Sequence, residues 1–173
     1  KKYYKLYTAA VDFKELQIGI DPYYLGLYFG IKSKNRSVNL DHELSKHILN
    51  YVEKRIDKFR ILNESYIPSE SYIPSEVYIP SEIKYNSKQI RLQFLLGLID
   101  AIGTCNIDYK IIQTSKSLAD DIVFVAKSIG LYSYIESTSD VYNSTLPVST
   151  LDVSTLDVST KKYIVHIGSS DIT

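Results

Sequence analysis

The stretch Phe94-Leu-Leu-Gly-Leu-Ile-Asp-Ala-Ile-Gly103 decides how this chain is expected to fold, because an apolar helix is interrupted there by Gly97. A glycine in a helix interior costs about 1 kcal/mol relative to alanine. The usual reason for such a glycine is that another backbone comes very close to it. The stretch therefore predicts a helix whose middle packs directly against a second helix.

The second helix is predicted upstream, in Tyr24-Leu-Gly-Leu-Tyr-Phe-Gly-Ile31. Aligning Gly26 with Gly97 also places Ile31 on Ile102 and keeps the leucines around each glycine in the same register. Two copies of one small-residue helix in a single chain predict two half-domains, packed helix against helix about a pseudo-twofold axis.

The second stretch resembles the LAGLIDADG motif of homing endonucleases, and the first resembles the LGLWLGDG variant found in inteins. Segments around both motifs are also similar to intein endonucleases: residues 11–13, 20–25, 79–82, 85–92 and 114–131. The resemblance implies an α+β fold with two pseudo-symmetric halves packed through a central helix pair. It also implies a site-specific DNA endonuclease that uses Mg²⁺ and binds double-stranded DNA.

The motif residues depart from the family at the positions that matter most for catalysis. In the family, the acidic residue just before each motif's final glycine binds the metal ions that cleave DNA, and here Ile31 and Ile102 occupy these positions. Isoleucine has no lone pair to offer Mg²⁺ or a metal-bound water. Asp100 matches an earlier acid, which in the family mainly caps and positions the helix end. A degenerate site without metal or cleavage is therefore predicted on motif helices that carry Gly26, Gly30, Gly97 and Gly103.

Two tandem repeats divide the sequence. Tyr-Ile-Pro-Ser-Glu begins at Tyr66, Tyr72 and Tyr78, and the proline in each copy disfavours a helix or a central strand. An extended linker is therefore predicted there. Leu-Pro/Asp-Val-Ser-Thr repeats later with a period of five, which predicts an expanded hairpin loop. The expected organisation is a shortened first half (1–65), a linker (66–82), and a second half (83–173) with an expanded loop (145–160).

Capping residues and periodicity predict the remaining elements. Helix starts are expected at Asp21 with Pro22, at Asp41, at Asn86 with Gln89, and at Ser117 with Asp120. Apolar spacing on two of these helices predicts buried faces at Leu44, Ile48, Val52 and Ile56, and at Leu118, Ile122, Val125 and Ile129, the latter helix ending at Gly130. Strands are expected over 3–13, 37–40, 108–114, 132–137 and 161–168.

The charge distribution bears on DNA binding. The net charge is zero, which argues against tight binding because neutralisation of phosphates by Lys and Arg dominates affinity. Residues 1–60 nevertheless carry twelve Lys and Arg against seven Asp and Glu, and residues 61–173 carry eight against thirteen. A nucleic-acid face is therefore expected to draw on the first half. Its best local cluster is Lys32, Lys34 and Arg36, for which a solvated loop is the equal alternative.

Gln113 and Lys116 are further candidates for DNA contact, because they lie at and just after the end of a predicted strand that faces the DNA in the family. Ordinary surface placement is the alternative for both. His42 and His47 miss the four-residue spacing that places two ligands on one helix face, and no Cys-His pattern exists, so no other metal site is predicted.

The bulk sequence excludes several classes of protein. There is no run of ~20 apolar residues for a membrane span and no apolar leader after the first lysines. The single Cys105 fits a reducing compartment, so an intracellular location in cytoplasm or nucleus is expected. A start without methionine suggests an excised or internal segment. Lys1 and the terminal Asp-Ile-Thr173 lack the nucleophile and the His-Asn pair of protein splicing.

The leading expectation is thus a degenerate intein-encoded LAGLIDADG domain without cleavage activity, with residual binding to double-stranded DNA. One alternative is an active metal-dependent endonuclease whose acids come from elsewhere or from a partner complex. Another is a non-enzymatic structural or interaction module within a host protein or larger assembly.

Overall fold

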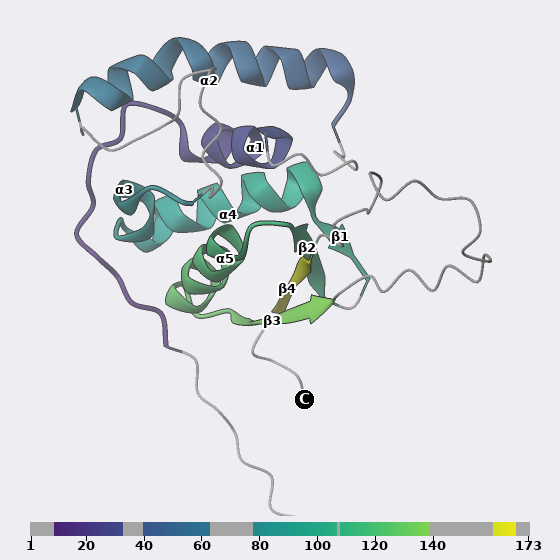
Figure 1. Ribbon diagram of the computed structural model, residues 1–173. Coiled ribbons are helices and arrows are strands. Elements are labelled where there is room, and N and C mark those ends of the chain that lie inside the picture. The colour runs from purple at the N-terminus through teal and green to yellow at the C-terminus, as the bar shows by residue number, and fades with distance from the viewer. Residues whose placement is uncertain (1–8, 33–39, 63–77, 107, 139–160, 169–173) are drawn as a thin grey trace, which may run out of the picture.

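The computed structural model describes residues 9–32, 40–62, 78–106, 108–138 and 161–168, which form five helices and four strands (Figure 1). The helices are α1 (Pro22–Lys32), α2 (His42–Leu62), α3 (Ser81–Lys84), α4 (Lys88–Ile102) and α5 (Lys116–Ser128). The strands are β1 (Thr104–Cys105), β2 (Tyr109–Gln113), β3 (Tyr132–Thr138) and β4 (Lys162–Gly168). Helices α2, α1 and α4 lie one above another, and α5 with the sheet lies beyond α4. The predicted α+β class is confirmed.

The helices α1 and α4 pack through their glycines in a reciprocal way. A Cβ atom added to Gly26 would lie 2.1 Å from the carbonyl oxygen of Phe94, and one added to Gly97 would lie 2.1 Å from that of Tyr23. Phe94 and Tyr23 each stand three residues before the glycine of their own helix. This equivalence of contacts is the signature of a local twofold axis. The predicted close approach at both glycines is confirmed.

The sheet is antiparallel with strand order β1-β2-β4-β3. Its inner face is apolar, with Ile111 opposite Val165 and with Ile167 also buried. The Ser133 hydroxyl on the same face donates to the Val123 carbonyl of α5, so α5 covers this face. Each of the four strands follows α4 in sequence, so among the described residues the twofold relation is confined to the helix pair.

The prediction of an extended linker over residues 66–82 is wrong at its C-terminal end. Ser81–Lys84 form α3, and Pro80 stands at its N-cap, where its lack of an N–H group costs little. Ile79 and Ile83 are both completely buried, and the Ile79 N–H donates to Asp121. The third Tyr-Ile-Pro-Ser-Glu copy is therefore part of the core, and the first two copies lie outside the described residues, as does the expected loop 145–160.

Two of the four predicted helix starts are confirmed. The Asp21 carboxylate accepts from the N–H groups of Tyr23 and Tyr24, and Asp41 caps α2 in the same way. The start of α5 is displaced, because its N-cap is Ser115, whose hydroxyl accepts from the Leu118 N–H. The predicted stop of this helix at Gly130 is confirmed, because Gly130 directly follows the C-cap residue of α5 and has a φ of 95°.

The predicted capping role of Asn86 is wrong. Ser87 is the N-cap of α4 and makes no side-chain cap hydrogen bond. The buried Asn86 side chain instead accepts from the Leu16 N–H and donates to the carbonyl groups of Leu16 and Glu82. A side chain that can both donate and accept is used to attach the N-terminal segment to the second half.

The N-terminal segment is not the strand that alternation predicted, at least over residues 9–13. Its backbone bonds elsewhere: the Val11 N–H donates to the Ser128 carbonyl, and the Val11 carbonyl accepts from the Arg91 guanidinium. Residues 1–8 and 37–39 lie outside the described part of the chain, and Leu40 is not in a strand.

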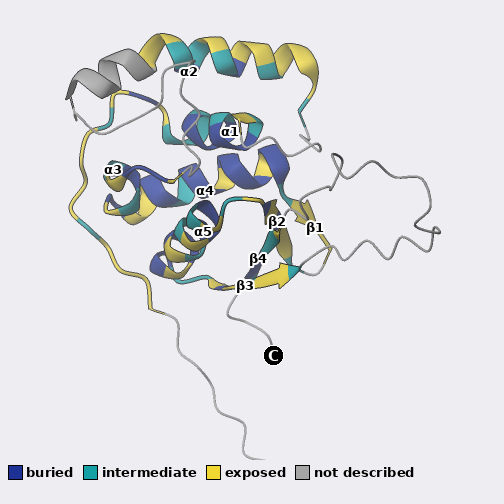
Figure 2. Cartoon of the chain, viewed as in Figure 1, coloured by how far each residue is buried: buried dark blue, intermediate teal, exposed yellow. Residues whose placement is uncertain are grey.

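The predicted apolar faces are largely confirmed. Ile48 and Val52 of α2 are fully buried, but Leu44 in the first turn of the helix is 44% exposed. The side chain of Ile56 lies outside the described part of the structure. The α5 face of Leu118, Ile122, Val125 and Ile129 is buried. In Figure 2, buried residues concentrate on α1 and α4, and the outer side of α2 is exposed. No described helix is both long and apolar enough to cross a membrane.

Candidate functional site

The C-terminal ends of α1 and α4 bring the two predicted metal-ligand positions together. A Cβ atom added to Gly30 would lie 2.4 Å from the Ala101 methyl group. The same atom would be in van der Waals contact with Ile102, 3.5 Å from its Cγ2. Gly30 and Ala101 are equivalent positions of the two motifs, so the local axis passes between them. Ile31 and Ile102 follow directly, and the two isoleucines thus flank the axis at the helix ends.

The chemistry at this point is apolar. Ile102 is 4% exposed, and Ile31 is partly buried and packs against the same core. Within the described residues there is no group of three His, Cys, Asp or Glu side chains that could hold a metal ion. Gly103 follows Ile102, and its N–H donates to the Ile99 carbonyl and closes the helix. The helix ends therefore present no described ligand set for a divalent cation.

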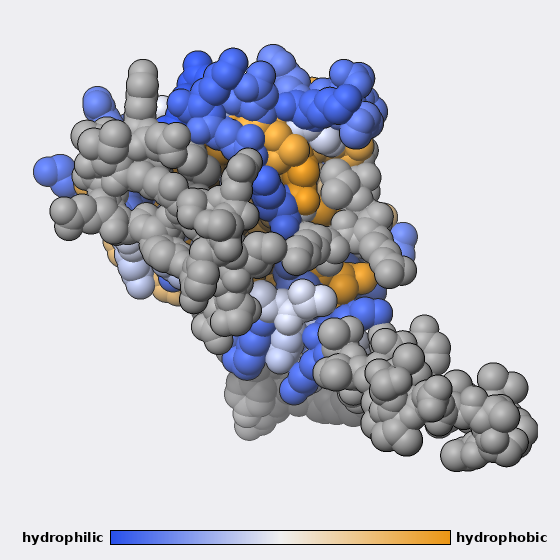
Figure 3. All heavy atoms as spheres, turned by 45° about the horizontal axis from the view of Figure 1, so that its top comes forward, coloured by the Kyte–Doolittle hydropathy of each residue, from blue (hydrophilic) through white to orange (hydrophobic). Residues whose placement is uncertain are grey.

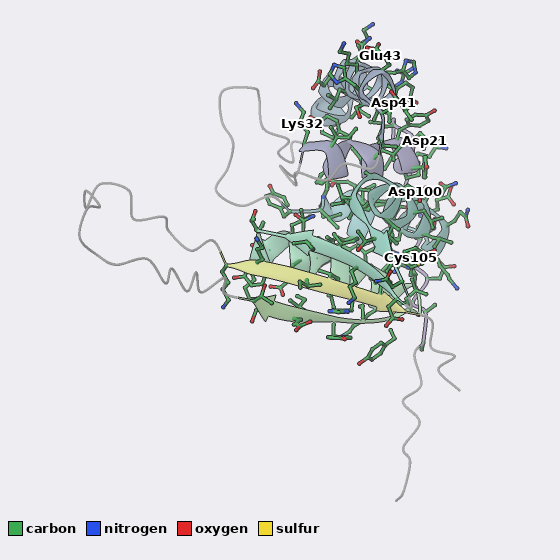
Figure 4. The ribbon with its side chains drawn as sticks, turned by 90° about the vertical axis from the view of Figure 1, so that its right-hand side faces the viewer. Asp21, Lys32, Asp41, Glu43, Asp100 and Cys105 are labelled. Atoms are coloured by element: carbon green, nitrogen blue, oxygen red, sulfur yellow. The ribbon has the colours of Figure 1, made fainter. Side chains whose placement is uncertain are left out.

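Asp100, the remaining acid of the second motif, connects the two motif helices. The Tyr23 hydroxyl donates to Asp100 Oδ2 at 2.8 Å across the helix pair. This hydrogen bond, together with burial and the negative charge of the carboxylate, raises the pKa of Tyr23 to about 12. In Figure 4, Asp100 lies on α4 and Asp21 lies near the start of α1.

The Tyr23 pKa predicts how this contact depends on pH. Tyr23→Phe should cost about 1 kcal/mol of unfolding free energy at pH 8, as for an ordinary hydrogen bond. Because the folded-state pKa lies above that of the unfolded chain, near 10, the contribution is complete below pH 10 and is lost as the pH rises toward 12. Urea unfolding at pH 8, 10 and 11 measures it, with Tyr85→Phe, an exposed ring, as the control. A cost for Tyr23→Phe that stays constant to pH 11 would contradict the assignment.

Of the candidate basic cluster Lys32, Lys34 and Arg36, only Lys32 belongs to the part of the chain that the structure describes. Lys32 ends α1, where its amine lies 3.1 Å from Glu53 and over the Tyr28 ring, and it is half-exposed. Figure 4 shows it at the end of α1 that is remote from Asp21. Lys34 and Arg36 lie outside the described residues. Because Glu53 already neutralises much of the charge of Lys32, this lysine is a weak anchor for phosphate.

Gln113 and Lys116 have very different environments. Gln113 is 1% exposed on the inner face of the sheet, so its side chain is not accessible to DNA. The expectation of DNA contact by Gln113 is therefore wrong, because the last residue of β2 shares the buried face with Ile111. Lys116 is exposed at the start of α5, and its amine pairs with Asp120 at 2.6 Å. This hydrogen bond and charge raise the pKa of Lys116.

The outer face of the sheet carries a polar and aromatic surface that sequence reasoning missed. Lys110 on β2 lies opposite His166 on β4, which lies opposite Tyr134 on β3. The Tyr134 and His166 rings are stacked, with centroids 4.5 Å apart and planes 2° from parallel. The Glu136 carboxylate lies 3.1 Å from His166 Nε2.

Exposed apolar and aromatic side chains lie beside this row. Tyr132 and Ile112 are each about 44% exposed, as is Tyr134 within the row. Strand alternation could have shown that Lys110 and Ile112 share a face opposite Ile111. It could not show which face α5 would cover. We call the set Lys110, Ile112, Tyr132, Tyr134, Glu136, Ile164 and His166 the outer sheet face.

The comparisons with known proteins agree with this architecture. Residues 78–146 match the family model described as homing endonuclease. The match covers the third Tyr-Ile-Pro-Ser-Glu copy, α3, α4, β1, β2, α5 and β3. No curated protein sequence matches the chain.

Proposed function

We propose that this chain, which carries a homing endonuclease domain over residues 78–146, binds duplex DNA but does not cleave it. The proposal includes an origin as an intein-encoded domain of the LAGLIDADG type, which rests on the two motif stretches. The observation that carries the loss of cleavage is the pair Ile31 and Ile102 at the helix ends, where metal ligands would have to converge.

The argument against hydrolysis is one of ligand chemistry. A divalent cation that activates water and stabilises a phosphodiester transition state needs hard oxygen ligands. Here the two side chains next to the axis are hydrocarbon, and the nearest motif acid, Asp100, is held by the Tyr23 hydroxyl. A cation would also have to displace apolar side chains that pack on the core, since Ile102 is nearly fully buried.

The argument for DNA binding rests on the outer sheet face. The major groove of duplex DNA admits a narrow β-sheet surface, and side chains that alternate along strands can reach base edges there. Lys110 contributes a positive charge for phosphate, and Tyr132 and Tyr134 contribute rigid exposed rings. Lys162, the first residue of β4, adds a second positive charge. The zero net charge predicts modest affinity, and the lysine contacts to phosphate predict that this affinity falls as the salt concentration rises.

The loss of cleavage is tested on supercoiled plasmid. With Mg²⁺ or Mn²⁺, we expect the unmodified chain to leave the plasmid intact. The double variant Ile31→Asp with Ile102→Asp places two carboxylates beside the axis and is expected to gain metal-dependent nicking. Nicking by the unmodified chain that EDTA abolishes would overturn the proposal in favour of an active endonuclease.

A matched control separates metal binding from a general effect of added charge. The variant Ile31→Asn with Ile102→Asn has nearly the same shape and polarity without the negative charges. It should remain inactive, because amide oxygens neutralise none of the charge of a divalent cation. Folding of each variant is checked by circular dichroism before the assay.

One surface feature favours the alternative of an interaction module. The rings of Phe13 and Phe124 both pack edge-on against Tyr85, at centroid distances of 5.8 and 5.6 Å. Tyr85 is 51% exposed and Phe124 is 37% exposed, so aromatic surface faces solvent away from the outer sheet face. If the chain fails to bind DNA, Tyr85→Ser is the variant with which to test association with a host protein.

A further inference from the structure

The two motif helices are covered by different structures, and this asymmetry bears on how much DNA one molecule can contact. On the α4 side, α5 and the four-stranded sheet form the next layer. On the α1 side, the next layer is α2 (Figure 1). Among the described residues, no strand lies on the α1 side, since each strand follows α4 in the chain.

The packing of α2 on α1 is specific. Ile48 and Val52 are completely buried, and the Tyr51 ring packs against Tyr24 with centroids 4.9 Å apart. The guanidinium of Arg55 lies over the Tyr51 ring, 3.9 Å from its centroid. The α2 helix thus uses its apolar face on α1, and the side of α2 that is visible in Figure 3 is mostly hydrophilic.

The lengths of the connections point the same way. Nine residues, 33–41, join α1 to α2, whereas thirteen residues, 103–115, join α4 to α5 and hold β1 and β2. In the second half, β3 and β4 come from a further 37 residues, 132–168, after α5. The stretch between α2 and α3 has 18 residues, 63–80, and its end is already used by the buried Ile79. The first half therefore has less chain outside its described helices than the second half has for its sheet and connections.

We propose that one molecule contacts duplex DNA through the outer sheet face alone and occupies a short stretch on one side of the local axis. This inference rests on the proposed DNA binding. Strands β3 and β4 have seven residues each and so extend about 24 Å. Since base pairs rise about 3.4 Å each, one sheet spans about seven base pairs. A molecule with two equivalent sheets would span about twice that length.

The length of DNA occupied by one molecule is measured by saturation. The probe is a 40-base-pair duplex of mixed sequence at low salt, titrated with the full chain and followed by analytical ultracentrifugation. We expect four or five molecules per duplex, because each occupies about seven to ten base pairs. Saturation at two molecules per duplex would overturn the one-sheet inference and leave the proposed DNA binding intact.

A pair of charge reversals locates the contact independently of stoichiometry. Lys110→Glu reverses a charge on the outer sheet face, and the control Lys54→Glu reverses a charge on the exposed surface of α2. We expect Lys110→Glu to weaken binding about tenfold or more, and Lys54→Glu to change it less than about twofold. Equal weakening by both variants would contradict contact through one sheet. If the unmodified chain binds no duplex at any salt concentration, the proposed DNA binding fails and this inference fails with it.

Discussion

Replacing Gly97 by alanine is expected to destabilise the chain by about 2–3 kcal/mol, although alanine is the better helix former by about 1 kcal/mol. The added methyl group would lie 2.1 Å from the Tyr23 carbonyl oxygen and 3.0 Å from the Leu27 nitrogen. Both are backbone atoms of α1, which cannot rotate aside as a side chain can. The helices must therefore move apart, and the packing around Leu25 and Leu98 is lost. Guanidinium unfolding followed by circular dichroism measures the change.

Gly19 provides the matched control. Nothing lies within 4 Å of a Cβ atom built there, so Gly19→Ala should change stability by less than about 0.5 kcal/mol. The reciprocal geometry adds a second expectation: Gly26→Ala should cost about as much as Gly97→Ala. The double variant should cost less than the sum, because one methyl group already separates the helices. A Gly97→Ala chain as stable as the parent would contradict the packing of α1 on α4.

The second large effect is expected at Arg91. This side chain has no exposed surface, and its guanidinium donates to the Asn86 carbonyl at 2.9 Å, to the Ser128 hydroxyl and to the Val11 carbonyl. Burial lowers the pKa of Arg91, which nevertheless stays charged at neutral pH. Arg91→Ala leaves the buried Asn86 carbonyl and the partly buried Val11 carbonyl without this donor, and it opens a cavity beside the Phe13 ring. We expect a loss of about 3 kcal/mol.

Arg55→Ala is the control for truncating an arginine that also lies over an aromatic ring. Arg55 is exposed on α2, so its removal should cost less than about 1 kcal/mol. Proteolysis gives a second readout, because Arg91→Ala should make the chain near Val11 easier to cleave while the folded fraction stays high. Equal stability of the two variants would show that the Arg91 contacts do not hold the N-terminal segment.

These contacts also explain how the N-terminal segment relates to the two motifs. Arg91, Asn86 and the Lys88 N–H, which donates to Asp12, all belong to the start of α4 or the turn before it. They hold the segment that leads into α1. The first motif is thus attached to the second through its approach as well as through the glycine contacts. Deleting this approach would therefore affect both motif helices.

The sequence by itself determined the helix pair. A glycine inside an apolar helix is unfavourable locally, so its repetition at Gly26 and Gly97 already implied a backbone contact, and the structure contains it. The sequence also predicted two helix caps, Asp21 and Asp41, and the helix stop at Gly130, because each acts on neighbours within a few residues. The absence of acids at Ile31 and Ile102 was also visible before any fold was known.

Tertiary structure alone decided what depends on partners distant in sequence. Asn86 and Leu16 are 70 residues apart, and that contact turned an expected helix cap into an anchor for the N-terminal segment. Ile79 and Ile83 are buried by elements that no local pattern identifies, so the end of the expected linker is part of α3 and the core. Gln113 and Lys110 alternate on one strand, and only the position of α5 makes one buried and the other exposed. Periodicity gives the two faces of a strand, but burial is fixed by the layer that packs on one of them.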